Sequence, residues 1–173
     1  MTRPEMPRRF FLVSGTAMLA LAACGPAKGE QDIVEEDTTA RFADSKWREL
    51  TEAEWRERLS PDAFRVMRKE GTERRFTSPL NAESRKGTYA CKGCGLALFS
   101  SDAKFDSGTG WPSFYDHIPG ALATKPDRKL LVVRTEYHCA RCLSHQGHVF
   151  EDGPPPTGLR YCNNGVALDF VPA

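Results

Sequence analysis

The chain has 173 residues, of which 40% are apolar, and its 24 basic side chains nearly match its 23 acidic ones. This composition is typical of one globular domain with an attached segment, and it excludes fibrous, collagenous and wholly disordered proteins. Because the charges balance, the chain has no strong electrostatic attraction to a phosphate backbone, and we predict no nucleic-acid partner. The 6 cysteines are many for this length, so their spacing must decide between disulfides, metal binding and catalysis.

The amino-terminal residues 1–23 have the features of an export signal. Arg8 and Arg9 precede an apolar stretch, residues 10–23, whose 14 residues are fewer than the roughly 17 to 25 that span a bilayer. This arrangement predicts a signal peptide. The arginine pair resembles a twin-arginine signal and the small residues before Cys24 resemble a lipobox, so we expect cleavage before Cys24 and acylation of its thiol. The alternative is a buried apolar helix with an incidental cysteine.

Residues 24–45 are polar, acidic and poor in large apolar side chains. Such a segment cannot bury enough surface to offset the entropy lost on ordering, so we predict a flexible tether. Together with the export signal, it predicts a lipoprotein of a bacterial envelope that faces the periplasm and is held to the membrane through the lipid on Cys24. The folded domain is then residues 46–173, and we expect it to be a monomer.

The folded part begins with two predicted helices. Thr51 and Glu54 form a capping-box pattern, and Ser60 precedes Pro61 at the first position of a second helix, which ends near Gly71. After this helix, short apolar runs between glycines and prolines predict strands at residues 88–90, 96–99, 130–137, 149–150, 159–161 and 166–171. Several short strands favour a mainly β fold with antiparallel sheets.

Two C-x-x-C pairs, Cys91 with Cys94 and Cys139 with Cys142, predict a metal site. Two residues between thiolates allow a tight turn to present both sulfurs to one ion, and two such turns complete a tetrahedral site. Four sulfur ligands without histidine favour one structural zinc per chain, with no open coordination position. The alternatives are two disulfides, or a redox dithiol, which usually accompanies a βαβ pattern that this sequence lacks.

One cysteine, Cys162, is left once one is assigned to the lipid and four to zinc. Its polar surroundings include Arg160, and a nearby cation favours the reactive thiolate. His145 and His148 are candidate proton donors. On a regular strand they would point to opposite faces, so both can serve one site only if Gly147 marks a bend or bulge. The alternatives are a buried structural thiol and histidines that belong to the core or the surface.

Several ordered motifs around these cysteines resemble the peptide-methionine (R)-S-oxide reductases of the MsrB family. The resemblance covers residues 46–172 and is carried by residues 71–73 (GTE), 105–114 (FDSGTGWPSF), 145–150 (HQGHVF), 152–154 (DGP) and 159–168 (LRYCNNGVAL). It implies two antiparallel sheets curled into an open barrel, with short helices at the amino end. It also implies reduction of the R epimer of methionine sulfoxide in proteins, here as repair of oxidised envelope proteins.

Carried over to this sequence, the resemblance implies that Cys162 attacks the sulfoxide sulfur and becomes a sulfenic acid. His145 and His148 would assist protonation of the departing oxygen, directly or through water. Asn164 would position substrate or water, and Trp111 would hold the ε-methyl group. Fixing three different groups around a chiral sulfur selects one epimer, as the division of labour between methionine sulfoxide reductases requires.

Three residues depart from the family pattern. Thr109 stands where many members have a resolving cysteine, so we expect an external thiol, either a small molecule or a thioredoxin-like protein, to reduce the sulfenic acid. Asn163 and Gln146 replace apolar residues beside the predicted site, and the sequence alone assigns them no role.

A second class of function stays open at this point: a zinc-stabilised β-domain lipoprotein that binds a partner and performs no chemistry. Its Cys162 would be structural. The joint presence of Cys162, His145, His148, Asn164 and Trp111 favours the enzyme, because a non-catalytic domain has little need of them together.

Overall fold

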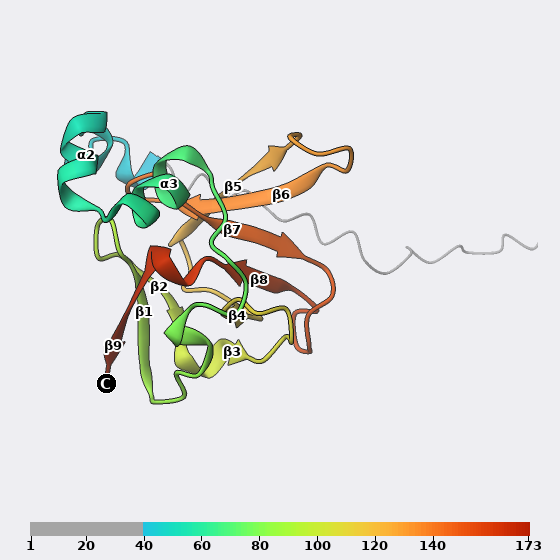
Figure 1. Ribbon diagram of the computed structural model, residues 1–173. Helices are drawn as coiled ribbons and strands as arrows, with labels where there is room; N and C mark the ends of the chain where they lie inside the picture. Colours follow the sequence, from blue (N-terminus) through green and yellow to red (C-terminus); the bar gives the residue numbers. More distant parts are fainter. Residues whose placement is uncertain (1–39) are drawn as a thin grey trace, which may run out of the picture. The chain divides into compact units, whose positions relative to one another are not determined.

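The computed structural model describes residues 40–173 (Figure 1). The predicted signal peptide, the predicted lipidation site Cys24 and residues 25–39 of the predicted tether lie outside the described residues. The described end of the predicted tether contains a short 3-10 helix, η1 (Ala40–Phe42). From residue 40 onward, no helix is long and apolar enough to cross a membrane.

Three short helices come first in the folded domain: α1 (Lys46–Glu49), α2 (Glu52–Arg58) and α3 (Pro61–Lys69). The predicted capping box is present at the start of α2. The Thr51 side chain accepts a hydrogen bond from the Glu54 N–H, and the Glu54 carboxylate accepts one from the Thr51 N–H. Ser60 caps α3 and Pro61 is its first residue, so both predicted helices are confirmed.

All strands pair antiparallel and form two sheets (Figure 1). The smaller sheet has the order β2-β1-β9, and the larger has the order β3-β4-β8-β7-β6-β5. The strands are β1 (Gly87–Cys91), β2 (Ala97–Ser100), β3 (Lys104–Phe105), β4 (Ser113–Phe114), β5 (Leu122–Asp127), β6 (Arg134–Cys139), β7 (His145–Phe150), β8 (Arg160–Asn163) and β9 (Leu168–Pro172), with 3-10 helices η2 (Pro79–Asn81), η3 (Ser101–Ala103) and η4 (Gly165–Ala167) in the connections. The predicted mainly β fold of two antiparallel sheets behind short helices is confirmed.

The core contains aromatic rings from both sheets. Phe99 of β2 stacks on Phe114 of β4 with ring centroids 4.2 Å apart, and Tyr89 of β1 meets the same Phe114 ring edge-on at 4.9 Å. Such pairs stabilise the fold beyond the area that they bury. Helix α3 packs against β7 and η4 and buries Phe64 and Met67. The core therefore fixes the strands that carry the predicted site.

The predicted strand at residues 130–137 is wrong in its first half. The strand begins at Arg134 and forms β6, whereas residues 130–133 are an exposed loop between β5 and β6. A run of β-branched and leucine side chains is typical of a strand, but periodicity cannot show which part of a run lacks a pairing partner. The neighbouring strand β5 and the two-residue strands β3 and β4 were not predicted. The predicted strand at residues 166–171 is η4 followed by β9.

Candidate functional site

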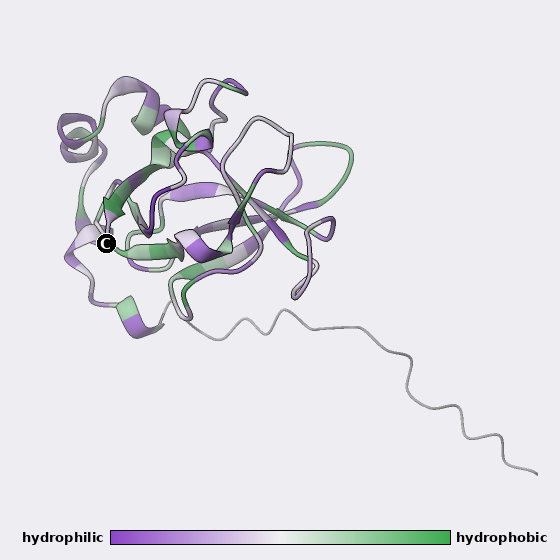
Figure 2. Ribbon diagram, turned by 90° about the horizontal axis from the view of Figure 1, so that it is seen from below, coloured by the Kyte–Doolittle hydropathy of each residue, from purple (hydrophilic) through white to green (hydrophobic). Residues whose placement is uncertain are grey.

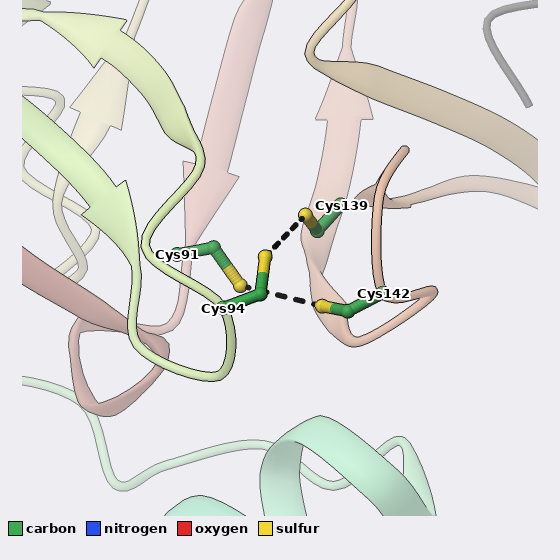
Figure 3. A group of neighbouring side chains, drawn as sticks. All are labelled: Cys91, Cys94, Cys139 and Cys142. Carbon is green, nitrogen blue, oxygen red and sulfur yellow. Dashed lines mark hydrogen bonds between the residues drawn. The ribbon is translucent and has the colours of Figure 1, made fainter. Parts of the chain in front are cut away.

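The four C-x-x-C cysteines meet at a junction between the two sheets. Cys91 ends β1 and Cys94 lies in the turn that leads to β2, whereas Cys139 ends β6 and Cys142 lies in the turn that leads to β7. Figure 3 shows the first pair facing the second, each from its own hairpin turn. All four are buried. The cluster therefore ties a hairpin of the small sheet to a hairpin of the large one.

The sulfur geometry fits a metal ion. Cys91 Sγ lies 3.6 Å from Cys142 Sγ, Cys94 Sγ lies 3.6 Å from Cys139 Sγ, and all four sulfurs are within 4.8 Å of one another. A tetrahedron of sulfurs about 2.3 Å from a central zinc has edges of about 3.8 Å. A disulfide requires a separation of about 2.05 Å, so the alternative of two disulfides does not describe this structure.

Polar donors surround these sulfurs. Arg141 Nε donates to Cys94 Sγ at 3.3 Å, and Gln146 Nε2 donates to Cys91 Sγ at 3.5 Å. Donors of this kind offset the negative charge that four metal-bound thiolates carry. Gln146 is fully buried, and its contact with Cys91 gives a physical reason for a polar residue at this position.

A second group of predicted residues lines a small pocket of about 110 Å³. Cys162 lies half-buried on β8, directly opposite His148 of the neighbouring strand β7. The pocket wall is formed by Thr72, Trp111, Arg134, Gly147, His148, Phe150, Cys162, Asn163 and Asn164. Four of the five predicted catalytic residues therefore share one cavity. The fifth, His145, is buried and does not line it.

The strand irregularity near Gly147 that a site shared by both histidines would require is present. Tyr137 of β6 pairs with Gly147 while the next residue, His138, pairs with His145, so one extra residue is inserted in β7. Such a bulge bends a strand and re-aims its side chains. As a result, the rings of His145 and His148 lie only 5.5 Å apart. A Cβ atom at Gly147 would lie 1.9 Å from the Cys162 carbonyl oxygen, so only glycine fits there.

Each histidine is held by a buried carboxylate. His148 Nε2 lies 2.8 Å from Asp127 Oδ2, and His145 Nδ1 lies 2.9 Å from Glu136 Oε1. The pKa of Asp127 is lowered by the Lys129 backbone N–H, by His148 and by Arg134. Burial acts to raise the pKa of Glu136, but hydrogen bonds from His145 and Lys125 hold it below its usual value.

Because an ionised carboxylate only accepts hydrogen bonds, each histidine carries a proton on the nitrogen that faces its acid. Burial lowers the pKa of His148, which favours its neutral form at neutral pH. Its other ring nitrogen is then an acceptor. The Nε2 atom of His145 is buried and has no hydrogen-bond partner among residues 40–173.

The thiol of Cys162 is shielded from water but lies near a cation. Burial raises its pKa, while the charge of Arg160 and side-chain hydrogen bonds from Thr109 and Arg160 act in the opposite direction. Arg160 is itself fixed, because its Nε and Nη2 atoms donate to the two carboxylate oxygens of Asp152, both at 2.7 Å. The thiol proton therefore remains in place at neutral pH until another group accepts it.

Glu73 connects the elements around the pocket. Its carboxylate accepts hydrogen bonds from the backbone N–H groups of Gly165, at 2.6 Å, and Val166, at 2.9 Å. Its own N–H donates to Asn164 Oδ1 at 2.9 Å, and its carbonyl accepts from Trp111 Nε1 at 3.2 Å. Burial raises the pKa of Glu73, against the effect of the two backbone donors.

The side chain of Asn164 is engaged by the backbone. Its Oδ1 accepts from Glu73, and its Nδ2 donates to the Gln146 carbonyl at 2.9 Å. In this structure Asn164 thus joins the segment that carries Glu73 to the bulge in β7. That it also positions substrate or water stays a prediction. Asn163, the other polar residue after Cys162, accepts from the Tyr137 hydroxyl at 2.8 Å and donates to the Asn164 carbonyl at 2.9 Å.

Sequence reasoning missed the acidic partners of the two histidines and the pocket residue Arg134. Asp127 lies 21 positions from His148, and no spacing rule pairs residues across an unpredicted strand. Glu73 did carry a signal, because it belongs to the short GTE motif, but the motif alone gave no role.

The comparisons with known proteins agree with this geometry. The SelR domain family matches residues 59–172. Peptide methionine sulfoxide reductase MsrB of Thiobacillus denitrificans is 54% identical over 123 residues, which cover 70% of this chain and 93% of that protein. The enzyme of the same name from Pseudomonas putida is 56% identical over 120 residues, which cover 69% and 90%.

Among solved structures, the Mis18 "Yippee-like" domain matches with a TM-score of 0.40 and 19% identity, covering 51% of this chain and 98% of that one. This likeness is too weak to carry an argument. The SelR match extends over more than half of the chain, and the curated relatives are matched over nearly their whole length. The chain belongs to the MsrB family of peptide methionine sulfoxide reductases.

Proposed function

We propose that this chain reduces the R epimer of methionine sulfoxide in proteins, with Cys162 as the nucleophile. The observation that carries the proposal is the placement of Cys162 directly opposite His148, in one pocket with Trp111. Family membership makes the chain a peptide methionine sulfoxide reductase. The pocket supplies what that reaction needs: a thiol, a group that handles a proton and an aromatic wall.

The net reaction transfers one oxygen atom. The sulfur of Cys162 attacks the sulfoxide sulfur and forms a transient S–S bond. The oxygen then passes to the Cys162 sulfur: the methionine S–O bond and the S–S bond break as the Cys162 S–O bond forms, which leaves methionine and Cys162 sulfenic acid. The cysteine is oxidised by two electrons as the methionine sulfur is reduced by two.

We assign the movement of the proton to His148. The pKa of the Cys162 thiol is raised and that of His148 is lowered, so before reaction the proton is on sulfur and the imidazole is neutral. His148 can accept the thiol proton and deliver it to the sulfoxide oxygen as the oxygen leaves. Asp127 stabilises the imidazolium that forms in between. His145, buried behind His148, is assigned a supporting role.

Trp111 is the proposed wall for the ε-methyl group. Its indole N–H is held by the Glu73 carbonyl, so the ring cannot easily turn away. With the methyl group against Trp111, the oxygen toward His148 and the γ-carbon leading out of the pocket to the rest of the polypeptide, all three substituents of the chiral sulfur are fixed. Only one epimer satisfies all three.

We expect turnover of an R methionine sulfoxide peptide and less than about 1% of that rate with the S epimer. This corresponds to a difference in activation free energy of about 2.7 kcal/mol or more. The measurement is reduction of the two separated epimers of a dabsyl-labelled substrate, with dithiothreitol as reductant. Comparable rates for both epimers would contradict the three-point arrangement, and no turnover of either would contradict the proposed function.

We also propose that the four clustered cysteines hold one structural zinc per chain. Four sulfurs satisfy a tetrahedral zinc and leave no position for water or substrate. A zinc ion bound to these four cysteines would hold the turn between β1 and β2 in contact with the turn between β6 and β7. Since β7 carries both histidines, the metal would hold the catalytic strand in register without touching the substrate.

We propose that an external thiol regenerates the reduced form of Cys162 after each turnover. After one turnover Cys162 is a sulfenic acid, and the four other described cysteines are in the buried cluster. A small thiol or a thioredoxin-like protein would attack the sulfenic acid, release water and form a mixed disulfide. A second thiol would then free Cys162.

Thr109→Cys is expected to create an internal route. Because the Thr109 side chain hydrogen-bonds the Cys162 thiol, a sulfur placed there can condense with the sulfenic acid. After one turnover with substrate and without reductant, mass spectrometry should find a disulfide between residues 109 and 162 in this variant. Wild type treated in the same way should carry one dimedone adduct on Cys162. Thr88→Cys, a matched change on β1 of the other sheet, should behave as wild type. If the Thr109→Cys variant still reacts with dimedone and forms no disulfide, the sulfur at position 109 cannot reach Cys162, and the expectation is wrong.

We further propose that the enzyme repairs envelope proteins as a periplasm-facing lipoprotein. The support is in the sequence: Arg8 and Arg9 before a short apolar run, small residues before Cys24, and an acidic segment after it. In cells, Cys24→Ala should shift the protein from the membrane fraction to the soluble fraction or leave residues 1–23 attached. Full-length wild type in the cytoplasm would contradict the proposal.

A further inference from the structure

The loop between β5 and β6 exposes a run of four aliphatic side chains. The exposed fractions are 59% for Leu130, 107% for Leu131, 72% for Val132 and 54% for Val133. Figure 1 shows this hairpin projecting from the edge of the large sheet, and Figure 2 shows its tip as a continuous apolar stretch. Contiguous exposed apolar residues of this kind mark interaction sites on soluble domains.

The loop begins after a residue that contacts His148 and ends before a residue that lines the proposed active-site pocket. Asp127 and Arg134 form the last pair of the β5–β6 ladder, and the loop is the chain between them. Asp127 contacts His148, while Arg134 lines the pocket together with Trp111. A polypeptide whose sulfoxide side chain entered the pocket would therefore have neighbouring residues beside the loop.

The charges around the loop favour an uncharged partner. Arg134 is paired with Asp127 at 2.6 Å, Lys125 with Glu70 at 2.5 Å, and Lys129 also with Glu70. Arg128 is the one cation of this loop that makes no ion pair within residues 40–173. An anionic lipid surface attracts clusters of free cations, and this loop does not present one.

We propose that residues 130–133 form a docking surface for the apolar residues that flank an oxidised methionine in a partly unfolded protein. Methionine is mostly buried in folded proteins, among other apolar side chains. Its oxidation disrupts that packing, so the segment that reaches the enzyme carries newly exposed apolar neighbours. The proposal rests on the proposed reductase function and adds the class of polypeptide that the site prefers.

The test compares the full chain with the double variant L131S/V132S on three R sulfoxide substrates. These are a pentapeptide with leucine and valine flanks, one of equal length with serine and glycine flanks, and N-acetyl-methionine sulfoxide. We expect kcat/KM for the apolar peptide to fall about 5- to 10-fold, mainly through KM. The other two substrates should change less than about twofold. V171S, which replaces a 52% exposed side chain on β9, is the matched control and should leave all three unchanged.

Equal losses on all three substrates would show that the variant disturbs the pocket, and no loss on any would show that the loop does not bind substrate; either result overturns the proposal. A membrane role has its own readout, co-sedimentation with phosphatidylglycerol vesicles, using Cys24→Ala in both proteins to remove any lipid. Loss of vesicle binding with unchanged peptide turnover would overturn substrate docking in favour of a membrane contact. Failure of wild type to reduce any of the three R sulfoxide substrates would instead count against the reductase function itself.

Discussion

Replacing Cys162 by serine is expected to lower methionine sulfoxide reduction at least about 10³-fold, since removing a nucleophile usually removes nearly all turnover. A hydroxyl is a far weaker nucleophile toward sulfur and cannot accept the oxygen reversibly. The measurement is single-turnover reduction of the R epimer, which needs no reductant. The variant should also trap no dimedone.

The same variant should fold normally, because Cys162 is half-buried and lies outside the buried cysteine cluster. Unchanged metal content and a melting temperature within about 3 °C of wild type would establish this. Substantial remaining activity would remove Cys162 from the mechanism. A wild type that lacks activity while binding a partner normally would instead support the non-catalytic binding domain.

Replacing Cys139 by serine is expected to release the metal and to lower stability by about 3 kcal/mol or more. The binding free energy of a structural zinc contributes directly to folding, and domains of this size are stable by only about 5 to 15 kcal/mol. The melting temperature should fall by about 10 °C or more. Elemental analysis and thermal unfolding measure the two effects on one sample.

Cys162→Ser is the matched control for Cys139→Ser, since it makes the same chemical change on a neighbouring part of the same sheet. Cys162→Ser should be inactive but as stable as wild type and still bind metal. Cys139→Ser should be less stable than wild type and lack the metal. Wild type that contains no metal and has two disulfides by mass spectrometry would overturn the zinc proposal.

The fold could be predicted where local signals were strong. The capping residues Thr51 and Ser60 placed two helices, and short runs between turn residues indicated most strands. The run at residues 130–137 misled because half of it has no pairing partner, and pairing depends on residues distant in the sequence. Strands as short as β3 and β4 leave no pattern to detect.

The residues of the candidate site could be predicted from the sequence, but the hydrogen bonds between them and their partners could not. Motifs singled out Cys162 and His148, and Gly147 was recognised as the place where a bulge would be needed to bring both histidines to one site. Asp127 could not be assigned to His148, because it lies on a strand that was not predicted. Gln146 had no role in the sequence, and only the contact with Cys91 in the folded protein gives it one.

The burial of the cluster cysteines has a further consequence for an enzyme that works where sulfur is being oxidised. Cys91, Cys139 and Cys142 are 0% exposed and Cys94 is 9% exposed, whereas Cys162 is more accessible. An oxidant from solvent therefore meets first the one thiol whose sulfenic acid is part of the proposed catalytic cycle. Met67, the only methionine in residues 40–173, lies on the buried face of helix α3 and is 1% exposed. The domain thus keeps its own oxidisable structural sulfur out of reach of the damage that it repairs in other proteins.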